Sequence, residues 1–462
     1  MNMNLSKARK PRLRTIAGVA LGVALCFEMS GALAQALGLV EAYHAALLND
    51  PTYRGAIYDN QAGQENIALG RAGLLPKVQA VYVPSKNRAD ITTTQTYLGK
   101  EYQNTTHPSY DSLNATIQIR QPLFNLGALA GYKQGIAKAE YSDAQFASRA
   151  QDLVLRLVGA YAEAQYAEDQ LALATAQRDA YLEQMHVNVR MFKQGEGTKT
   201  DMLETQSRAS LAEAQVLEAQ DNLTTARHTL AGIVGMEITE LVPLSRDFKA
   251  LPIEPPSAEA WRAIALTKNA EIVALNAAIE VSRQEANRQR SGHAPTLDLV
   301  ASYGQQNATT TSTYNQDSTV RAVGVELNIP IFSGGYTSAA TRQAVAGYEK
   351  TRTDLDAKIS QISVEVQKQF SLVLSGAQKI EALMKSVESA SLLIEATKQS
   401  IKGGVRINLD LLNAQQQLYA SRRDLAQARY NYLLAYLRLR NAAGTLGAQD
   451  LIDIAGYFTQ IN

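Results

Sequence analysis

The chain has 462 residues, of which 46% are hydrophobic and 19% are charged, and this composition excludes a disordered or collagen-like protein. Its 45 Lys and Arg residues balance 44 Asp and Glu residues, so the net charge of +1 gives no reason to expect a nucleic-acid partner. A single cysteine excludes a disulfide within the chain.

The first 34 residues have the order of a secretory signal peptide. Five basic side chains, the last of them Arg14, precede an apolar run at 16–27. The Ala-Leu-Ala motif at 32–34 then predicts cleavage before Gln35. The apolar run is too short to span a membrane as a helix, and no later run is longer. An exported chain of this kind would enter a membrane only as β-structure.

The remainder of the chain contains an internal duplication. Residues 192–206 align with 401–415, and residues 121–124 align with 329–332. We therefore predict a signal peptide at 1–34, a first repeat at 35–250, a proline-containing linker at 251–256, a second repeat at 257–447 and a C-terminal tail at 448–462.

Each repeat predicts the same elements in the same order. A first helix is expected at 37–73 and again at 257–291, followed by two strands within 76–122 and two within 296–330. The strands flank polar loops at about 84–110 and 304–319. A long helix follows at 127–192 and at 336–402, and then a helix with heptad spacing at 200–231 and at 408–441.

The strand and helix assignments rest on two patterns. Before Pro330, apolar Val325 and Leu327 alternate with polar Glu326 and Asn328, which is the period of a strand with one apolar face. Taken alone, this pattern fits equally well a soluble sheet that packs one face on a core. The long helices keep apolar residues at heptad spacing, and 66 residues of helix measure about 100 Å. We therefore expect an elongated helical tube or rod.

The sequence contains no recognisable catalytic or metal-binding pattern. The five histidines are scattered without metal-ligand spacing. The segment 195–200 lacks the spacing of a phosphate-binding loop and is interpreted as a turn between antiparallel helices. We expect no enzyme activity, no metal and no cofactor.

The duplicated plan resembles the TolC family of outer membrane channels. The most specific match begins at Gly404, runs through Asn413 and continues to Leu433, which is similar to the gate loop and last helix of that family. The resemblance implies a mainly α-helical chain with membrane β-strands. It implies a homotrimer in which a twelve-stranded outer membrane β-barrel is continuous with a long periplasmic α-helical coiled-coil tunnel.

The same resemblance implies an exit duct of a tripartite export machine. Its partners would be a periplasmic adaptor, an inner-membrane transporter that is either an ABC or a proton-driven type, and outer membrane lipid. We predict type I protein secretion, with multidrug efflux as the alternative. Cys26 follows Leu25, not the small residue of a lipoprotein signal, and this favours secretion because many efflux relatives are lipoproteins. A non-channel periplasmic coiled-coil protein would explain the heptads but not the paired strands.

The resemblance also implies a periplasmic gate. Asp410 matches a first acidic ring, whereas the second acidic ring falls on Asn413. Arg406 and Asp201 match an Arg–Asp link between the repeats. The family has a tyrosine that would pair near Thr200, and this chain has Ile401 at that position. The expected gate residues are therefore Asp201, Thr200, Ile401, Arg406, Asp410 and Asn413.

Two further sets of residues are expected to act in a channel. The two turns should lie at the periplasmic tip and dock the adaptor through Gly195, Gly197, Lys199, Gly403 and Gly404. The polar faces of the strands should line the lumen of a closed barrel, with the apolar faces toward lipid. The lumen-facing residues are Asn114, Thr116, Gln118, Arg120, Glu326 and Asn328.

Overall fold

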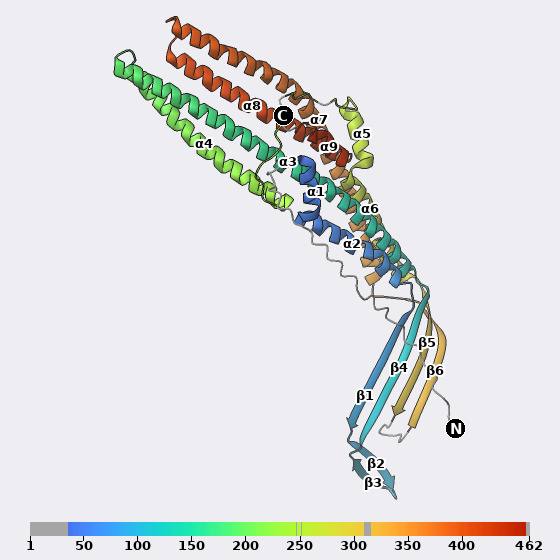
Figure 1. The fold of residues 1–462 in the computed structure, drawn as a ribbon. Coiled ribbons are helices and arrows are strands. Elements are labelled where there is room, and N and C mark those ends of the chain that lie inside the picture. The colour runs from blue at the N-terminus through green and yellow to red at the C-terminus, as the bar shows by residue number, and fades with distance from the viewer. Residues whose placement is uncertain (1–35, 246, 251, 309–315, 459–462) are drawn as a thin grey trace, which may run out of the picture.

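The computed structural model describes residues 36–245, 247–250, 252–308 and 316–458. The predicted signal peptide at 1–34 lies outside these residues, as do residue 251 of the linker and residues 459–462 of the tail. The described chain is elongated, with a sheet at one end and two long helical hairpins at the other (Figure 1).

Four long helices form the two hairpins. In the first repeat α3 (Leu126–Gln194) turns into α4 (Lys199–Val234), and in the second α7 (Tyr336–Lys402) turns into α8 (Asn408–Ala442). The buried positions of α4 are mostly small, with alanine at 209, 212, 219 and 226. Small side chains at heptad spacing allow neighbouring helix backbones to approach closely, which explains why each hairpin is a tight pair.

The first helix of each repeat is divided in two, so the single helices predicted at 37–73 and 257–291 are wrong. The first repeat has α1 (Leu39–Asn49) and α2 (Pro51–Ala72), and the second has α5 (Ala258–Lys268) and α6 (Ala270–Arg290). Asp50 accepts a hydrogen bond from the amide of Tyr53, and Asn269 accepts from the amides of Glu271 and Ile272. Each side chain caps a new helix, which ends the preceding one.

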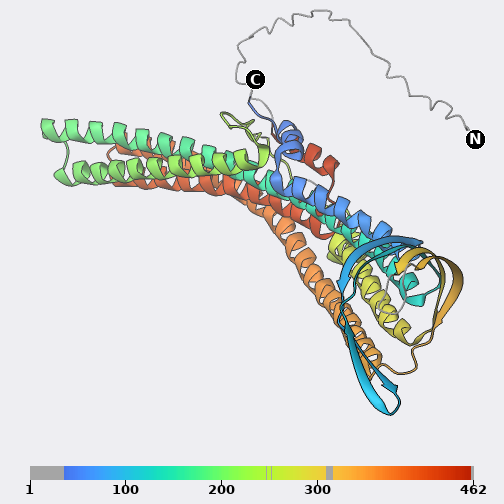
Figure 2. The ribbon, with the colours of Figure 1, turned by 90° about the horizontal axis from the view of Figure 1, so that it is seen from below.

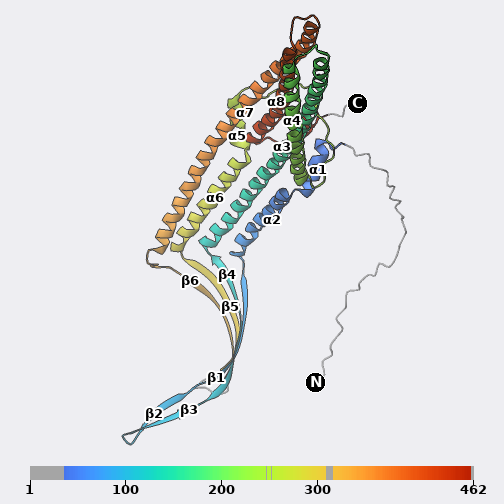
Figure 3. The same cartoon turned by 90° about the vertical axis from the view of Figure 1, so that its left-hand side faces the viewer.

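The larger sheet has four antiparallel strands in the order β1-β4-β5-β6. Their bounds are β1 (Lys77–Arg88), β4 (Ser109–Phe124), β5 (Thr296–Ala308) and β6 (Gln316–Asn328). In Figure 3 the helices α2, α3, α6 and α7 lie side by side in the same order as these strands, each helix continuing one strand. Viewed from below, the four strands curve into an arc (Figure 2).

The expected polar loop at 84–110 is wrong, because most of it is strand. It contains a second, two-stranded sheet of β2 (Ile91–Tyr97) and β3 (Lys100–Thr106), so this region has four strands where two were predicted. Threonine-rich strands exposed on both faces carry no apolar alternation, although β-branched threonine favours extended backbone. The expected loop at 304–319 is also shorter, since β5 reaches Ala308 and β6 begins at Gln316. Its residues 309–315 lie outside the described chain.

The largest core lies at the waist, where α1, α5 and α9 (Ala448–Ala455) pack around the long helices. Tyr161 is completely buried there and donates a hydrogen bond to the carbonyl of Leu37, while it accepts one from the amide of Val242. Trp261 and Tyr432 are two further large aromatic residues of this core that are almost completely buried. Within the described parts of the chain, no helix is both long enough and apolar enough to cross a membrane.

Candidate functional site

The turn between α3 and α4 is held by its own residues. Gly195 adopts a φ of +76°, a left-handed conformation that suits glycine, and the amide of Glu196 donates back to the carbonyl of Met191. Thr198 then caps α4, accepting a hydrogen bond from the amide of Asp201 at 3.1 Å and donating its hydroxyl to the Asp201 carboxylate at 2.6 Å. The predicted gate residue Asp201 therefore belongs to a helix cap.

The turn between α7 and α8 closes in the same way but begins its second helix differently. Gly404 has a φ of +74°, and the amide of Val405 donates to the carbonyl of Ser400 at 2.9 Å. Ile407 occupies the cap position of α8 and provides no side-chain hydrogen bond. Arg406 Nη1 lies 3.9 Å from Asp410 Oδ2 in the first turn of that helix.

The structure separates the predicted gate residues into these two turns. It brings Arg406 next to Asp410, whereas the side-chain partner of Asp201 is Thr198, so the contacts found within one chain do not join Arg406 to Asp201. Thr200 is exposed at the start of α4, and Ile401 is half-buried against the contact between α7 and α8.

The two predicted docking turns lie at the end of the molecule that is farthest from the sheet, each at the tip of its own hairpin (Figure 1). Lys199, Gly195, Gly403 and Gly404 are exposed, and Gly197 is half-exposed. A groove runs between the two tips. Its apolar lining comes from Val187, Met191, Ile401 and Leu411, and its charged rim comes from Glu196, Asp201, Glu395, Lys398 and Lys402.

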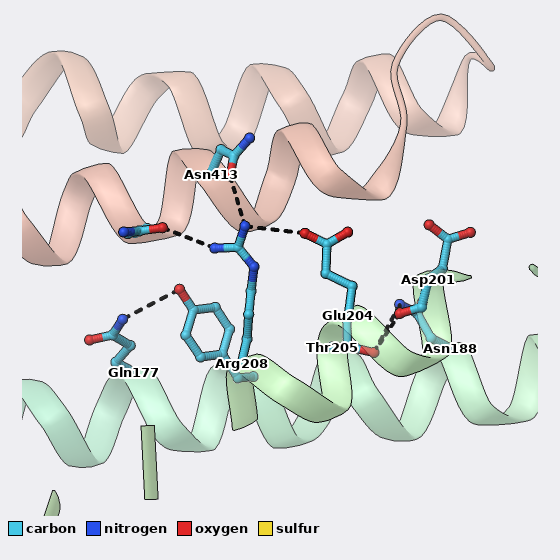
Figure 4. A network of polar contacts seen from close by, with 9 residues as sticks. Gln177, Asn188, Asp201, Glu204, Thr205, Arg208 and Asn413 are labelled. Atoms are coloured by element: carbon cyan, nitrogen blue, oxygen red, sulfur yellow. Dashed lines mark hydrogen bonds and ion pairs between the residues drawn. The ribbon is translucent and has the colours of Figure 1, made fainter. Parts of the chain in front are cut away.

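Sequence reasoning missed Arg208, which is one of the residues that join the two repeats near the tips. Arg208 of α4 donates from Nη2 to Asn413 Oδ1 of α8 at 3.0 Å, and from Nη1 to Gln416 Oε1 of the same helix at 2.9 Å (Figure 4). The same guanidinium forms an ion pair with Glu204 on its own helix at 3.2 Å. The sequence signal is weak, because Arg208 stands one residue before the seam position Ala209 and no repeat symmetry marks it.

Apolar and polar contacts surround this arginine. The side chain of Leu412 is completely buried in a cluster with Tyr181, Ala209 and Ala212, so it extends from α8 into the surface of the first repeat. Nearer the tips, Gln184 of α3 donates to Asn408 Oδ1 at 2.8 Å. The N-terminal part of α8 is therefore attached to the first repeat by both kinds of contact.

The six polar strand positions share one face of the larger sheet. Residues paired directly in an antiparallel sheet point to the same side. The register pairs Asn114 with Gln306, Thr116 with Gly304 and Gln118 with Ser302. It also pairs Glu326 with Asp298 and Asn328 with Thr296.

An ion triad crosses three strands on this face. Arg120 Nη1 lies 2.8 Å from Asp298 Oδ2, and its Nη2 lies 2.8 Å from Glu326 Oε2. The sequence pattern identified Arg120 and Glu326, which pair directly, but the third member of the triad, Asp298, was not among the predicted site residues. Within the described part of the chain, no group of three or more His, Cys, Asp or Glu side chains is arranged to hold a metal ion.

Comparison with known proteins now identifies the family. The model of the outer membrane efflux protein family matches residues 42–236 and 261–445, one segment in each repeat. The chain belongs to the outer membrane efflux protein family. This match confirms the predicted relationship to TolC-like channels and the outer membrane location, and it sets aside the alternative of a non-channel coiled-coil protein.

Individual relatives match over most of their length. The alkaline protease secretion protein AprF of Pseudomonas aeruginosa is 43% identical over 426 residues, which is 92% of this chain and 88% of that protein. The proteases secretion protein PrtF of Dickeya chrysanthemi is 41% identical over 436 residues, 93% of each. The solved outer-membrane channel OprN has a TM-score of 0.75 at 17% identity, covering 88% of this chain and 90% of that one, which shows the shared fold.

Proposed function

We propose that this protein is the outer membrane exit duct of a type I protein secretion machine. The observation that carries the proposal is the identity of 43% and 41%, along nearly the whole chain, with two proteins named for protease secretion. The efflux alternative is supported by a relative of lower identity, the outer membrane efflux protein BepC of Brucella suis, which is 27% identical over 85% of this chain. Secretion is therefore the favoured function.

Deleting the gene tests the choice between the two functions. We expect one or more exported proteins to disappear from the medium and to return when the intact gene is restored, with little change in sensitivity to a panel of drugs. Increased drug sensitivity with an unchanged set of secreted proteins would contradict the secretion role and favour efflux.

We further propose that three copies close a twelve-stranded barrel. The four-stranded sheet ends in β1 and β6, whose outer edges carry unpaired backbone groups. Such edges are not tolerated in hydrocarbon, so each β6 would pair with β1 of the next copy. The apolar face supports the proposal because Val323, Val325 and Leu327 are 79%, 61% and 59% exposed in a single chain. The opposite face, with the Arg120 triad, would line the lumen.

Matched substitutions on opposite faces of β6 test this barrel. Val325→Arg would put a charge in lipid and cost about 2–4 kcal/mol near the membrane centre, whereas Asn328→Arg would face water and be tolerated. Trimer assembly is measured by heat-resistant migration in detergent, with β-structure followed by circular dichroism. Equal assembly of the two variants would contradict the assigned faces.

The helical end would then form a periplasmic tunnel that receives an adaptor and an inner-membrane transporter of the ABC or proton-driven type. In this proposal residues 1–34 are removed as a signal peptide, and the two repeats supply one hairpin each. The groove between the tips combines an apolar floor with a charged rim, as expected for docking another helical hairpin. Cysteine introduced at Lys199 or Lys402 should crosslink to the adaptor. Crosslinks only from positions in β2 and β3 would reverse the proposed orientation.

The tips would also carry the gate. Three copies of Asp410 around a narrow axis would form one anionic ring and favour cations. Arg406 and Asp201 lie in separate turns of one chain, so we assign their link to neighbouring copies of the trimer. Asp410→Ala should reduce the cation preference, and Arg406→Ser should raise the single-channel conductance. Unchanged values in both variants would contradict this gate.

A further inference from the structure

A polar contact between the two repeats near the tips involves Arg208, which lies outside the gate positions that the family resemblance marks. One planar guanidinium reaches two amide oxygens of α8, those of Asn413 at 3.0 Å and Gln416 at 2.9 Å. Figure 4 shows the side chain extending from α4 across to α8, with Glu204 beside it. An arginine can hold several acceptors at once in a fixed plane, which a lysine cannot do.

We infer that Arg208 holds α8 on the first repeat at the periplasmic end and thereby sets both the conductance and the ion preference of the closed channel. This inference rests on the proposed function as an outer membrane duct. It deepens that function by naming a positioning residue within each chain, whereas the Arg406–Asp201 link would join different chains.

The geometry favours Arg208 over Arg406 as the stronger attachment within the chain. The side chain of Arg208 is 23% exposed, and its three polar contacts are between 2.9 and 3.2 Å. Arg406 is 50% exposed, and its ion-pair partner is 3.9 Å away, at Asp410 in the first turn of α8. Contacts that are shielded from water are less weakened by solvent and salt than exposed ones. Arg208 is therefore the more effective tether of α8.

The hydrogen bonds of Arg208 lie next to the apolar contact that Leu412 of α8 makes with α4. Leu412 is completely buried against Ala209 and Ala212, which follow Arg208 on α4. Asn413, the amide that Arg208 binds, directly follows Leu412. An outward movement of α8 would have to withdraw Leu412 and break the Arg208 hydrogen bonds together. We therefore expect the apolar contact and the hydrogen bonds to break together.

The same contact changes the charge at this level of the tunnel. At Asn413, where the family resemblance implies a second acidic ring, this chain has a neutral amide bound to a guanidinium. Glu204 compensates the arginine through an ion pair on the same helix, so this level carries balanced charge. In the proposed trimer, Asp410 then forms the ring of negative charge at the tip, and no second acidic ring forms at position 413. Removing Arg208 would leave Glu204 uncompensated and make this level anionic.

Three variants of the full chain, purified as trimers and measured in planar lipid bilayers, test the inference. Arg208→Ala should more than double the single-channel conductance and shift the ion preference toward cations. Arg208→Lys keeps the charge but loses the planar contacts, so it should raise the conductance with little change in ion preference. Arg178→Ala is the matched control, since Arg178 pairs with its sequence neighbour Asp179 at 2.7 Å. It should behave as the unmodified protein.

A triple substitution tests whether Arg208 acts through α8. If it does, Arg208→Ala combined with Asn413→Ala and Gln416→Ala should raise the conductance no further than Arg208→Ala alone, because both remove the same contact. Equal conductance and equal ion preference of Arg208→Ala and Arg178→Ala would overturn the inference. An unmodified protein that forms no channels would instead overturn the proposed duct. If Arg208→Ala does not assemble, the conductance of Arg208→Lys tests the inference instead. A conductance equal to that of Arg178→Ala would then overturn it.

Discussion

The two hairpin tips follow one duplicated plan but are stabilised differently. A glycine with positive φ follows each long helix, Gly195 in the first repeat and Gly404, one residue later, in the second. Beyond that point α4 begins with Thr198 as a side-chain cap, while α8 begins at Ile407 without one. The start of α8 instead depends on contacts with the other repeat, through Gln184, Arg208 and the socket around Leu412.

This difference indicates which tip can move. A helix that is capped by its own turn keeps its first turn when its neighbours shift, because the capping hydrogen bonds travel with it. A helix end held by a neighbouring repeat loses those contacts when it separates from that repeat. The second hairpin is therefore the one suited to opening, and the first is suited to act as the fixed support.

The largest expected effect is on stability, and it concerns two leucines at equivalent positions of the two repeats. Leu412 is completely buried, whereas the residue at the same place in the first repeat, Leu203, is 49% exposed. Leu412→Ala should reduce the free energy of unfolding by about 2–5 kcal/mol, because it removes buried apolar atoms and leaves a cavity. Leu203→Ala should change it by less than about 0.5 kcal/mol. Thermal unfolding in detergent micelles, followed by circular dichroism, measures both, and equal losses would contradict the asymmetry.

A pH-dependent effect compares the equivalent helix caps Asp50 and Asn269. Asp50 is 2% exposed, and although burial alone would raise its pKa, hydrogen bonds from Arg156 and from the Tyr53 amide outweigh burial and hold the pKa below its ordinary value of 3.8. A carboxyl whose pKa is lowered by folding stabilises the protein above its unfolded pKa. That stabilisation is lost as the pH falls below about 4 and passes through the folded pKa.

Asp50→Asn gives the first repeat the cap residue of the second. It should reduce the free energy of unfolding at pH 7 by about 1.5–3 kcal/mol, since hydrogen bonds to a charged group are lost. The difference from the unmodified protein should shrink as the pH falls below about 4. Denaturant unfolding at pH 7 and pH 3 measures it, and a difference that is the same at both would show that the carboxylate charge is not the cause.

A smaller effect is expected at the cap of α4. Thr198→Ala removes the acceptor for the Asp201 amide and should reduce the free energy of unfolding by about 1 kcal/mol. Hydrogen exchange at the first amides of α4 should become faster. Thr200→Ala is the control, because Thr200 is exposed two residues after Thr198 and does not cap the helix. Identical exchange in the two variants would contradict the role of Thr198.

The smallest expected effect comes from a substitution that gives the second tip a capping side chain, as the first tip has. Ile407 has extended backbone angles that suit a capping residue, and its side chain is 63% exposed. Ile407→Ser should stabilise the start of α8 by about 0.5–1 kcal/mol. Slower hydrogen exchange at the amides of Asp410 and its neighbours would measure this gain. Unchanged exchange would mean that contacts with the first repeat already hold this turn fully.

Much of the fold could be predicted from local patterns. The heptad spacing after Gly127 and Tyr336 corresponds to α3 and α7, and the alternation around Val325 corresponds to β6. The β2–β3 hairpin could not be predicted in this way, because its threonines are exposed on both faces and leave no alternation. The break at Asp50 has a local signal that was overlooked, because Asp50 is followed by Pro51 at the first position of α2. The break at Asn269 has a cap residue but no proline after it.

The sequence by itself determined the duplication, the long helices, the polar and apolar strand faces and the family, because each depends on residues near one another in the chain or on motif order. The tertiary structure decided which polar side chains meet. Arg208 and Asn413 are separated by 205 positions, and Arg120 and Asp298 by 178. No spacing rule connects such pairs, since each contact exists only after helices or strands from different repeats have packed side by side.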